Sequence, residues 1–163
     1  MPNRPFYEQL SIAPAFVGAR AQRLASLIGE QGDALLENVG SVIPARCIST
    51  IIYLDKNGPS SLVEIARALN EQHQLTAHRA KQLERLSIVT RKPDANDKRR
   101  RTFQLTQKGR DEAKRVEANC HLAIDIFDTI SDEIGLDLNM ALDRAYAVLK
   151  HRPLIDRAKE VQK

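Results

Sequence analysis

Four consecutive cations, Lys98 to Arg101, follow Asp97 in the stretch "RKPDANDKRRRTFQLTQKG", which spans residues 91–109. Guanidinium and ammonium groups bind phosphate oxygens, so this run predicts contact with a polyanion. The positive charge is local: residues 72–110 contain 11 Lys and Arg against 3 Asp and Glu, whereas the rest of the chain has a net charge of −4. A basic segment on an otherwise acidic protein indicates one face for polyanions and a body that does something else.

The cations stand between two segments that favour β-structure. Ile88 and Val89 favour a strand, residues 93–96 have the composition of a turn, and positions 99, 101, 103 and 105 share one parity of a returning strand. We therefore predict a hairpin with a cationic tip that reaches into a phosphate-walled groove. Asp97 is expected to orient the Arg99 guanidinium through a charge-assisted pair.

Two short helices are expected before the hairpin. Ser61 and Glu64 stand three residues apart and can form a capping box, which predicts a helix over 62–69 that ends at Asn70 in a left-handed conformation. The helical pattern resumes at residue 73 and continues to Ser87. Its expected inward stripe is Leu75, Ala80, Leu83 and Leu86. Such a pair resembles a helix-turn-helix whose second helix enters a major groove, although ordinary helical hairpins share this spacing.

Longer helices flank this segment. We expect a first helix from about Pro14 to Gly40, which could be interrupted near Gly29 and Gly32, and a compact one from Pro44 to residues 55–58. Beyond a Thr106 N-cap, apolar residues recur at helical spacing to residue 130 and again over 138–149, until Pro153. These stripes are too long for one small core, so they predict burial against a second copy of the chain.

The sequence contains no motif that supports catalysis. It has no phosphate-cradling glycine loop, nucleophile motif, His-x-x-x-His or Cys-x-x-Cys pair, so we expect no enzymatic activity, cofactor or metal. Cys47 lies in a strongly apolar helix, where a thiol is usually a buried hydrophobe, and Cys120 beside His121 lacks further ligands nearby. No apolar run is long enough for a membrane span and the start lacks a secretion signal, so a cytoplasmic protein is expected.

The order of elements and three motifs resemble the MarR-type (multiple antibiotic resistance regulator) winged-helix transcription factors over about residues 10–150. The motifs are "LVEIARALN", "LERLSIVTRKPD" and "DKRRRTFQLTQKG", the last of which is similar to that family's wing signature. The resemblance implies a mainly α (α+β) winged helix-turn-helix fold of about six helices and a small β-hairpin wing. The chain would be a single MarR-like unit over 1–163, with a DNA-binding lobe over 42–106 and dimerisation helices over 10–40 and 107–152.

The same resemblance implies an obligate homodimer that binds double-stranded DNA at a pseudo-palindromic operator. Its recognition helix would be Gln72 to Leu86, and Arg99 would be the wing arginine in the minor groove. Family members typically repress transcription and often release DNA when a small aromatic or anionic effector binds. Two positions depart from the family pattern. Ser87 replaces a frequent glycine, with little effect expected, and Arg79 replaces an apolar residue, which affects how the recognition helix packs.

Within the recognition helix, Gln74, Ala77 and His78 are the candidates for reading base edges, while Lys81 and Arg85 are candidates for phosphate or base contacts. The full set of expected DNA-binding residues is Gln72, His73, Gln74, Ala77, His78, Lys81, Arg85, Arg91, Lys98, Arg99, Arg100 and Arg101. Two alternative functions stay open at this point. One is a winged-helix module that binds an acidic protein without specific DNA binding, and the other is a regulator that responds to oxidants through cysteine.

Overall fold

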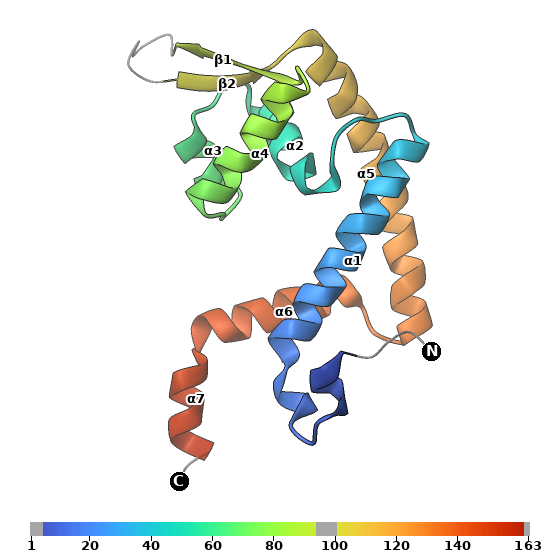
Figure 1. Ribbon diagram of the computed structural model, residues 1–163, viewed down its shortest axis with the longest axis vertical. Helices are drawn as coiled ribbons and strands as arrows, with labels where there is room; N and C mark the ends of the chain where they lie inside the picture. Colours follow the sequence, from blue (N-terminus) through green and yellow to red (C-terminus); the bar gives the residue numbers. More distant parts are fainter. Residues whose placement is uncertain (1–4, 94–100, 162–163) are drawn as a thin grey trace. The chain divides into compact units, whose positions relative to one another are not determined.

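The computed structural model describes residues 5–93 and 101–161, which form seven α-helices and one two-stranded antiparallel hairpin (Figure 1). The elements are α1 (Val17–Asn38), α2 (Ile48–Asn57), α3 (Leu62–Ala68), α4 (His73–Arg85), β1 (Val89–Pro93), β2 (Arg101–Leu105), α5 (Gln107–Ile134), α6 (Leu138–His151) and α7 (Leu154–Val161). Short 3₁₀ turns occupy Phe6–Gln9, Ala13–Ala15 and Ala45–Cys47. The expected mainly α winged-helix class is confirmed.

The chain divides into two compact units, residues 1–119 and 120–163. Helix α5 contributes its first half to one unit and its second half to the other. Within the described residues, no helix is both long enough and apolar enough to cross a membrane.

Helix α1 is continuous over 22 residues, so the interruption considered near Gly29 and Gly32 is wrong. A glycine inside a helix costs only about 1 kcal/mol relative to alanine, which a helix of this length tolerates. The helix also begins later than expected, at Val17, because Pro14 lies in a separate 3₁₀ turn.

The core of the first unit is built by the segment before α2, by α2, α3, α4, the hairpin and the first half of α5. Its fully enclosed side chains include Cys47, Ile51, Ile65, Leu83, Ile88, Phe103 and Val116. In the hairpin, Val89 pairs with Leu105 and Pro93 with Arg101. Phe103 also exchanges two backbone hydrogen bonds with Ser60, at 2.8 and 3.0 Å, which fastens the hairpin to the segment before α3.

The second unit contains one helix more than the sequence predicted. We expected the chain to leave helical structure at Pro153, but α7 begins at the next residue, Leu154. Proline has a fixed φ that suits the entry to a helix, so Pro153 can stand immediately before α7 as well as after the end of α6. Arg157 of α7 donates to the carbonyl oxygens of Arg152 and Val148, at 3.2 and 3.3 Å, and so ties α7 to the end of α6.

Candidate nucleic-acid interface

Helix α3 and the turn after it form as the sequence predicted. The Ser61 backbone N–H donates to Glu64 Oε2 at 2.7 Å, and the Glu64 N–H donates to Ser61 Oγ at 3.3 Å, which completes the capping box. Asn70 has φ 50°, the left-handed conformation expected at the end of this helix. The Glu71 N–H then returns to the Ala66 carbonyl oxygen at 2.9 Å, so the turn that leads into α4 is tightly fixed.

The inner face of α4 differs from the expected one by a single position. Thr76, Ala80 and Leu83 are at most 1% exposed, whereas Leu75 is 43% exposed and Leu86 is half-buried. Thr76 can be buried because its hydroxyl lies 3.4 Å from both the Gln72 carbonyl oxygen and Glu71 Oε2. The expected stripe was wrong at Leu75 because a threonine, rather than the neighbouring leucine, continues the buried row.

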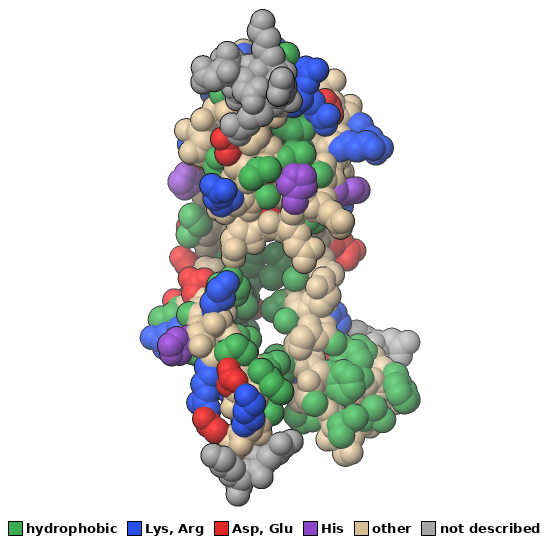
Figure 2. All heavy atoms as spheres, turned by 90° about the vertical axis from the view of Figure 1, so that its left-hand side faces the viewer, with side chains coloured by type: hydrophobic (Ala, Val, Ile, Leu, Met, Phe, Trp, Pro, Cys, Tyr) green, Lys and Arg blue, Asp and Glu red, His purple; other side chains and the backbone are tan. Residues whose placement is uncertain are grey.

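The outer face of α4 presents a stripe of four exposed side chains. At about 100° per residue, Gln74, His78, Lys81 and Arg85 fall within an arc of about 60°, roughly opposite the buried face. Among the residues that the structure describes, neither Lys81 nor Arg85 forms an ion pair. We call Gln74, His78, Lys81 and Arg85 the outer stripe. Figure 2 shows lysine, arginine and histidine side chains around a small apolar area on the part of the molecule that contains α3 and α4.

The remaining residues expected from α4 flank the outer stripe. Gln72 is the N-cap residue in extended conformation and His73 begins the helix, and both are exposed. Ala77 is half-buried, so less of it is available to a partner than expected. The exposed Leu75 stands on the same first turn and was not a predicted contact. A sequence analysis that treated Thr76 as a buried position would have identified Leu75 as exposed.

Two carboxylates, one on α4 and one in the turn before it, are paired with arginines. Glu84 lies 3.6 Å from the Arg91 guanidinium, and Glu71 forms an ion pair with Arg79. Arg79 also reaches Ser49 Oγ on α2 at 3.4 Å, and its side chain is 16% exposed. The cation at a position expected to be apolar is therefore turned inward, and its charge is compensated.

The base of the hairpin holds one predicted residue against an aromatic ring. Arg91 lies opposite Phe103 in the ladder, and its guanidinium carbon is 4.8 Å from the Phe103 ring centroid. Arg101 begins β2 and is exposed, as is Lys92, a cation that the sequence reasoning did not include. The expected contacts Lys98, Arg99 and Arg100, and the expected pairing of Asp97 with Arg99, lie outside the described residues.

A shallow depression of about 260 Å³ lies between the hairpin base and the start of α3. It is lined by Ser61, Leu62, Val63, Arg91, Arg101 and Phe103. Its wall is mostly apolar, and two arginines stand among its lining residues.

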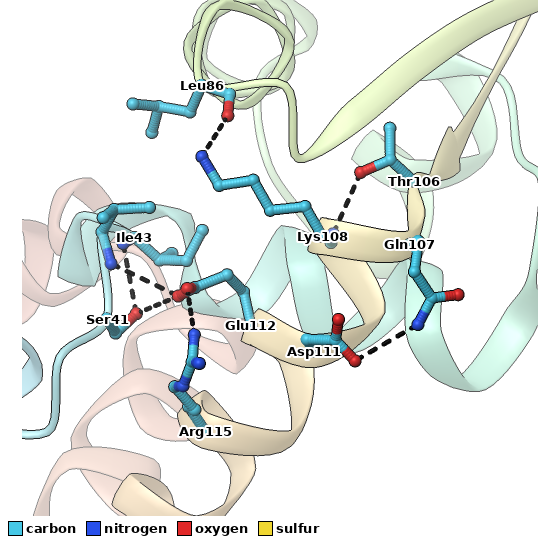
Figure 3. Close-up of polar contacts among 11 residues, drawn as sticks. Ser41, Ile43, Leu86, Thr106, Gln107, Lys108, Asp111, Glu112 and Arg115 are labelled. Atoms are coloured by element: carbon cyan, nitrogen blue, oxygen red, sulfur yellow. Dashed lines mark hydrogen bonds and ion pairs between the residues drawn. The ribbon is translucent and has the colours of Figure 1, made fainter.

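The "LTQKG" segment joins the hairpin, the end of α4 and the start of α5 (Figure 3). Thr106 caps α5 by accepting from the Gly109 N–H at 3.0 Å, as predicted, and its hydroxyl donates to the Ser87 carbonyl oxygen at 2.7 Å. Lys108 Nζ donates to the Leu86 carbonyl oxygen at 3.0 Å, which caps α4. Gly109 is required by close approach, because a Cβ there would lie 2.1 Å from the Ile88 carbonyl oxygen.

Ser87 follows α4 with φ 58°, a conformation that glycine adopts more easily. The replacement of glycine by serine, which we expected to matter little, therefore carries a conformational cost of about 1 kcal/mol.

A buried carboxylate fixes the segment before α2 to α5. Glu112 is 3% exposed and accepts from Ser41 Oγ at 2.7 Å and from Arg115 Nη1 at 2.6 Å (Figure 3). Further along α5, Glu117 accepts from Lys56 Nζ of α2 at 2.6 Å, and this hydrogen bond raises the pKa of Lys56. The first half of α5 is thus held against α2 and the segment before it by polar as well as apolar contacts.

Cys47 is fully buried, and burial raises the pKa of its thiol to about 11, although the nearby Arg46 and Arg79 act in the opposite direction. A protonated and enclosed thiol is a poor nucleophile. Within residues 5–93 and 101–161, no three His, Cys, Asp or Glu side chains are grouped so as to hold a metal ion.

Comparison with solved structures shows that this fold occurs in other proteins. The chain is similar to reduced AbfR bound to DNA, with 22% identity and a TM-score of 0.63 over 88% of this chain and 97% of that one. It is similar to a MarR family transcription regulator, with 15% identity and a TM-score of 0.60 over 89% and 98% of the two chains. It is also similar to the heme sensor protein PefR from Streptococcus agalactiae in complex with heme, with 15% identity and a TM-score of 0.58 over 86% and 96%. Neither a protein-family model nor a curated protein matches the sequence.

Proposed function

We propose that this chain, which has a MarR-type winged-helix fold, is a cytoplasmic, homodimeric, sequence-specific DNA-binding regulator of transcription. The observation that carries the proposal is the outer stripe of α4. Gln74, His78, Lys81 and Arg85 point outward from a helix whose opposite face is locked by buried residues. Amide, imidazole, ammonium and guanidinium groups on one helical face can contact base edges and phosphates in a major groove.

The hairpin extends the proposed contact beyond α4. Arg91, Lys92 and Arg101 add positive charge at its base, and we propose that Lys98 to Arg100 also contact DNA. We assign Arg99 to a minor groove, with Asp97 as the residue that orients it. The pairing of Glu84 with Arg91 supports DNA contact by α4, since a bare carboxylate close to phosphates would oppose binding.

Exposed apolar side chains support a homodimer formed through the long helices. Val17, Leu24 and Leu27 on α1 are 42–68% exposed, and the second unit exposes Ile134, Leu142, Tyr146 and Val148 among others. A two-fold dimer would present two α4 helices to half-sites about 34–36 Å apart, or a multiple of this. Sedimentation at micromolar concentration should give twice the mass of the chain.

Selection of bound duplexes from a random pool tests the proposal directly. An inverted-repeat motif is expected, and the selected duplex should compete far better than a scrambled one of equal length at the same salt concentration. A ratio of affinities near one would instead favour a module that binds an acidic protein, because any basic surface attracts polyanions.

Repression, and release by a small aromatic or anionic effector, complete the proposal. The depression lined by Arg91, Arg101 and Phe103 supports this chemistry, since it combines cations with an apolar wall. We expect salicylate or benzoate to weaken binding of the protein to its selected duplex, and a titration of the complex with either compound measures this. A cysteine-based response is disfavoured at Cys47, because burial and a raised pKa keep that thiol protonated.

A further inference from the structure

We infer that the Glu71–Arg79 ion pair positions α4, by setting the rotation of this helix about its own axis, and thereby determines how well the chain discriminates between DNA sequences. The inference rests on the proposed function, because it concerns the direction in which the outer-stripe side chains point when DNA is bound.

Arg79 joins three separate elements through one guanidinium group. It forms an ion pair with Glu71, which belongs to the turn before α4, and its Nη1 lies 3.4 Å from Ser49 Oγ on α2. Each of the two charged side chains is only 16% exposed. The pair therefore lies within the packed helix-turn-helix rather than on a solvated surface.

Glu71 is itself held from two sides. Its backbone N–H donates to the Ala66 carbonyl oxygen at 2.9 Å, and its carboxylate lies 3.4 Å from the Thr76 hydroxyl. The backbone bond anchors Glu71 to α3, so Glu71 gives Arg79 a fixed point outside α4, and the Thr76 contact is a second link from Glu71 to α4. Rotation of α4 about its axis would pull Arg79 away from Glu71 and Ser49 together.

The apolar contacts of α4 do not fix this rotation to the same degree. Two of its three most buried residues, Thr76 and Ala80, are small, and contacts between apolar atoms carry little directional preference. Hydrogen bonds and ion pairs depend strongly on angle and distance. The Glu71–Arg79–Ser49 contacts therefore supply the directional constraint that the apolar face lacks.

Arg79 is poorly suited to two simpler roles, direct contact with DNA and stabilisation of the fold. At about 100° per residue it lies about 140° from Gln74 around α4, so it points away from the face that would meet DNA. Its Nε–H is enclosed without an acceptor among the described residues, which lowers the gain in stability from the pair. A partly satisfied buried pair is better suited to fixing a geometry than to stabilising a fold.

The test compares DNA discrimination in variants that keep the net charge of the chain. The Glu71→Gln, Arg79→Met double variant removes both charges and keeps side chains of similar length. The Lys56→Met, Glu117→Gln variant is the matched control, because it removes an ion pair between α2 and α5 without touching α4. The measured quantity is the ratio of dissociation constants for a scrambled duplex and for the duplex that the parent selects from a random pool, at fixed salt and below every melting temperature.

We expect the ratio to fall about tenfold in the Glu71→Gln, Arg79→Met variant, the loss that follows when one good base contact is misplaced, with affinity for scrambled DNA unchanged. The control should keep the parental ratio. A parental ratio in the folded double variant would overturn the inference and leave the proposed function standing. A ratio near one in the parent would remove the proposed function and this inference together.

A second variant decides the matter if the double variant does not fold. Arg79→Lys keeps the charge next to Glu71 and therefore the fold. Arg79 reaches both Glu71 and Ser49 through Nη1, and the rotating ammonium group of lysine does not fix the direction of these bonds as the planar guanidinium does. A ratio reduced several-fold supports positioning by Arg79. An unchanged ratio in this folded variant would show that the pair only stabilises the protein.

Discussion

Substituting Gly109 by alanine should destabilise the winged lobe, although alanine is the better helix former. Gly109 lies in the first turn of α5, where an added Cβ would stand 2.1 Å from the Ile88 carbonyl oxygen, 3.1 Å from its carbonyl carbon and 3.3 Å from Leu105 Cβ. The nearest of these atoms is backbone, so no side-chain rotation can relieve the clash. The start of α5 must move away from the strand by about 1 Å.

The expected cost combines three effects. Overpacking of this kind costs about 1–3 kcal/mol. Moving α5 also weakens the hydrogen bond that the Ile88 carbonyl oxygen accepts from the Thr106 N–H at 3.0 Å, which is worth about 1 kcal/mol. Alanine returns about 1 kcal/mol in helix propensity. The net loss is about 1–3 kcal/mol, or a melting temperature lower by roughly 2–12 °C.

Thermal unfolding followed by circular dichroism measures this difference, with Gly29→Ala as the control. Gly29 is also inside a helix, but a Cβ there would meet no atom within 4 Å, so this substitution should raise stability by up to about 1 kcal/mol. If Gly109→Ala melted at the parental temperature, the close contact between α5 and Ile88 would not exist as described.

Four further outcomes are expected. Ser87→Gly should raise the free energy of unfolding by about 1 kcal/mol, because φ at this position is 58°. Chemical denaturation measures this free energy, and a value equal to that of the parent would show that the strain is absent. Lys81→Ala should weaken binding to all duplexes and lower the slope of log affinity against log salt by about 1, whereas Lys114→Ala on α5 should leave the slope unchanged. Arg99→Ala should weaken operator binding by about 1–3 kcal/mol at matched salt, and parental affinity in a filter-binding assay would refute the wing assignment. Because burial raises the pKa of Cys47 from 9.0 to about 11, its protonated form favours the folded state, so stability should fall as pH rises from 9 towards 11, and Cys47→Ala should remove that part of the dependence.

Local chemistry made much of the helix-turn-helix predictable. The capping box of Ser61 and Glu64, the left-handed Asn70 and the Thr106 cap each depend on residues within a few positions of one another, so the sequence contains the whole interaction. The hairpin also followed from alternation and turn composition.

The errors have different physical causes. The buried row on α4 was displaced because Thr76 satisfies its hydroxyl locally and can replace an apolar residue, which leaves Leu75 outside. Helix α7 was missed because Pro153 can begin a helix as well as end one. The partners of Arg79 were not predictable, since Ser49 lies 30 positions away and meets it only after the helices have packed.

Several arginines and lysines of the basic segment, residues 72–110, are bound to other groups of the same chain. Arg79 is bound to Glu71, Lys108 to the Leu86 carbonyl oxygen, and Arg110 to the Leu105 carbonyl oxygen and the Gln107 side chain. The 11 cations counted over residues 72–110 thus overstate the number that can displace counterions from a duplex. With at most eight available per chain, the proposed binding to DNA should release no more than about seven counterions for each copy of the chain.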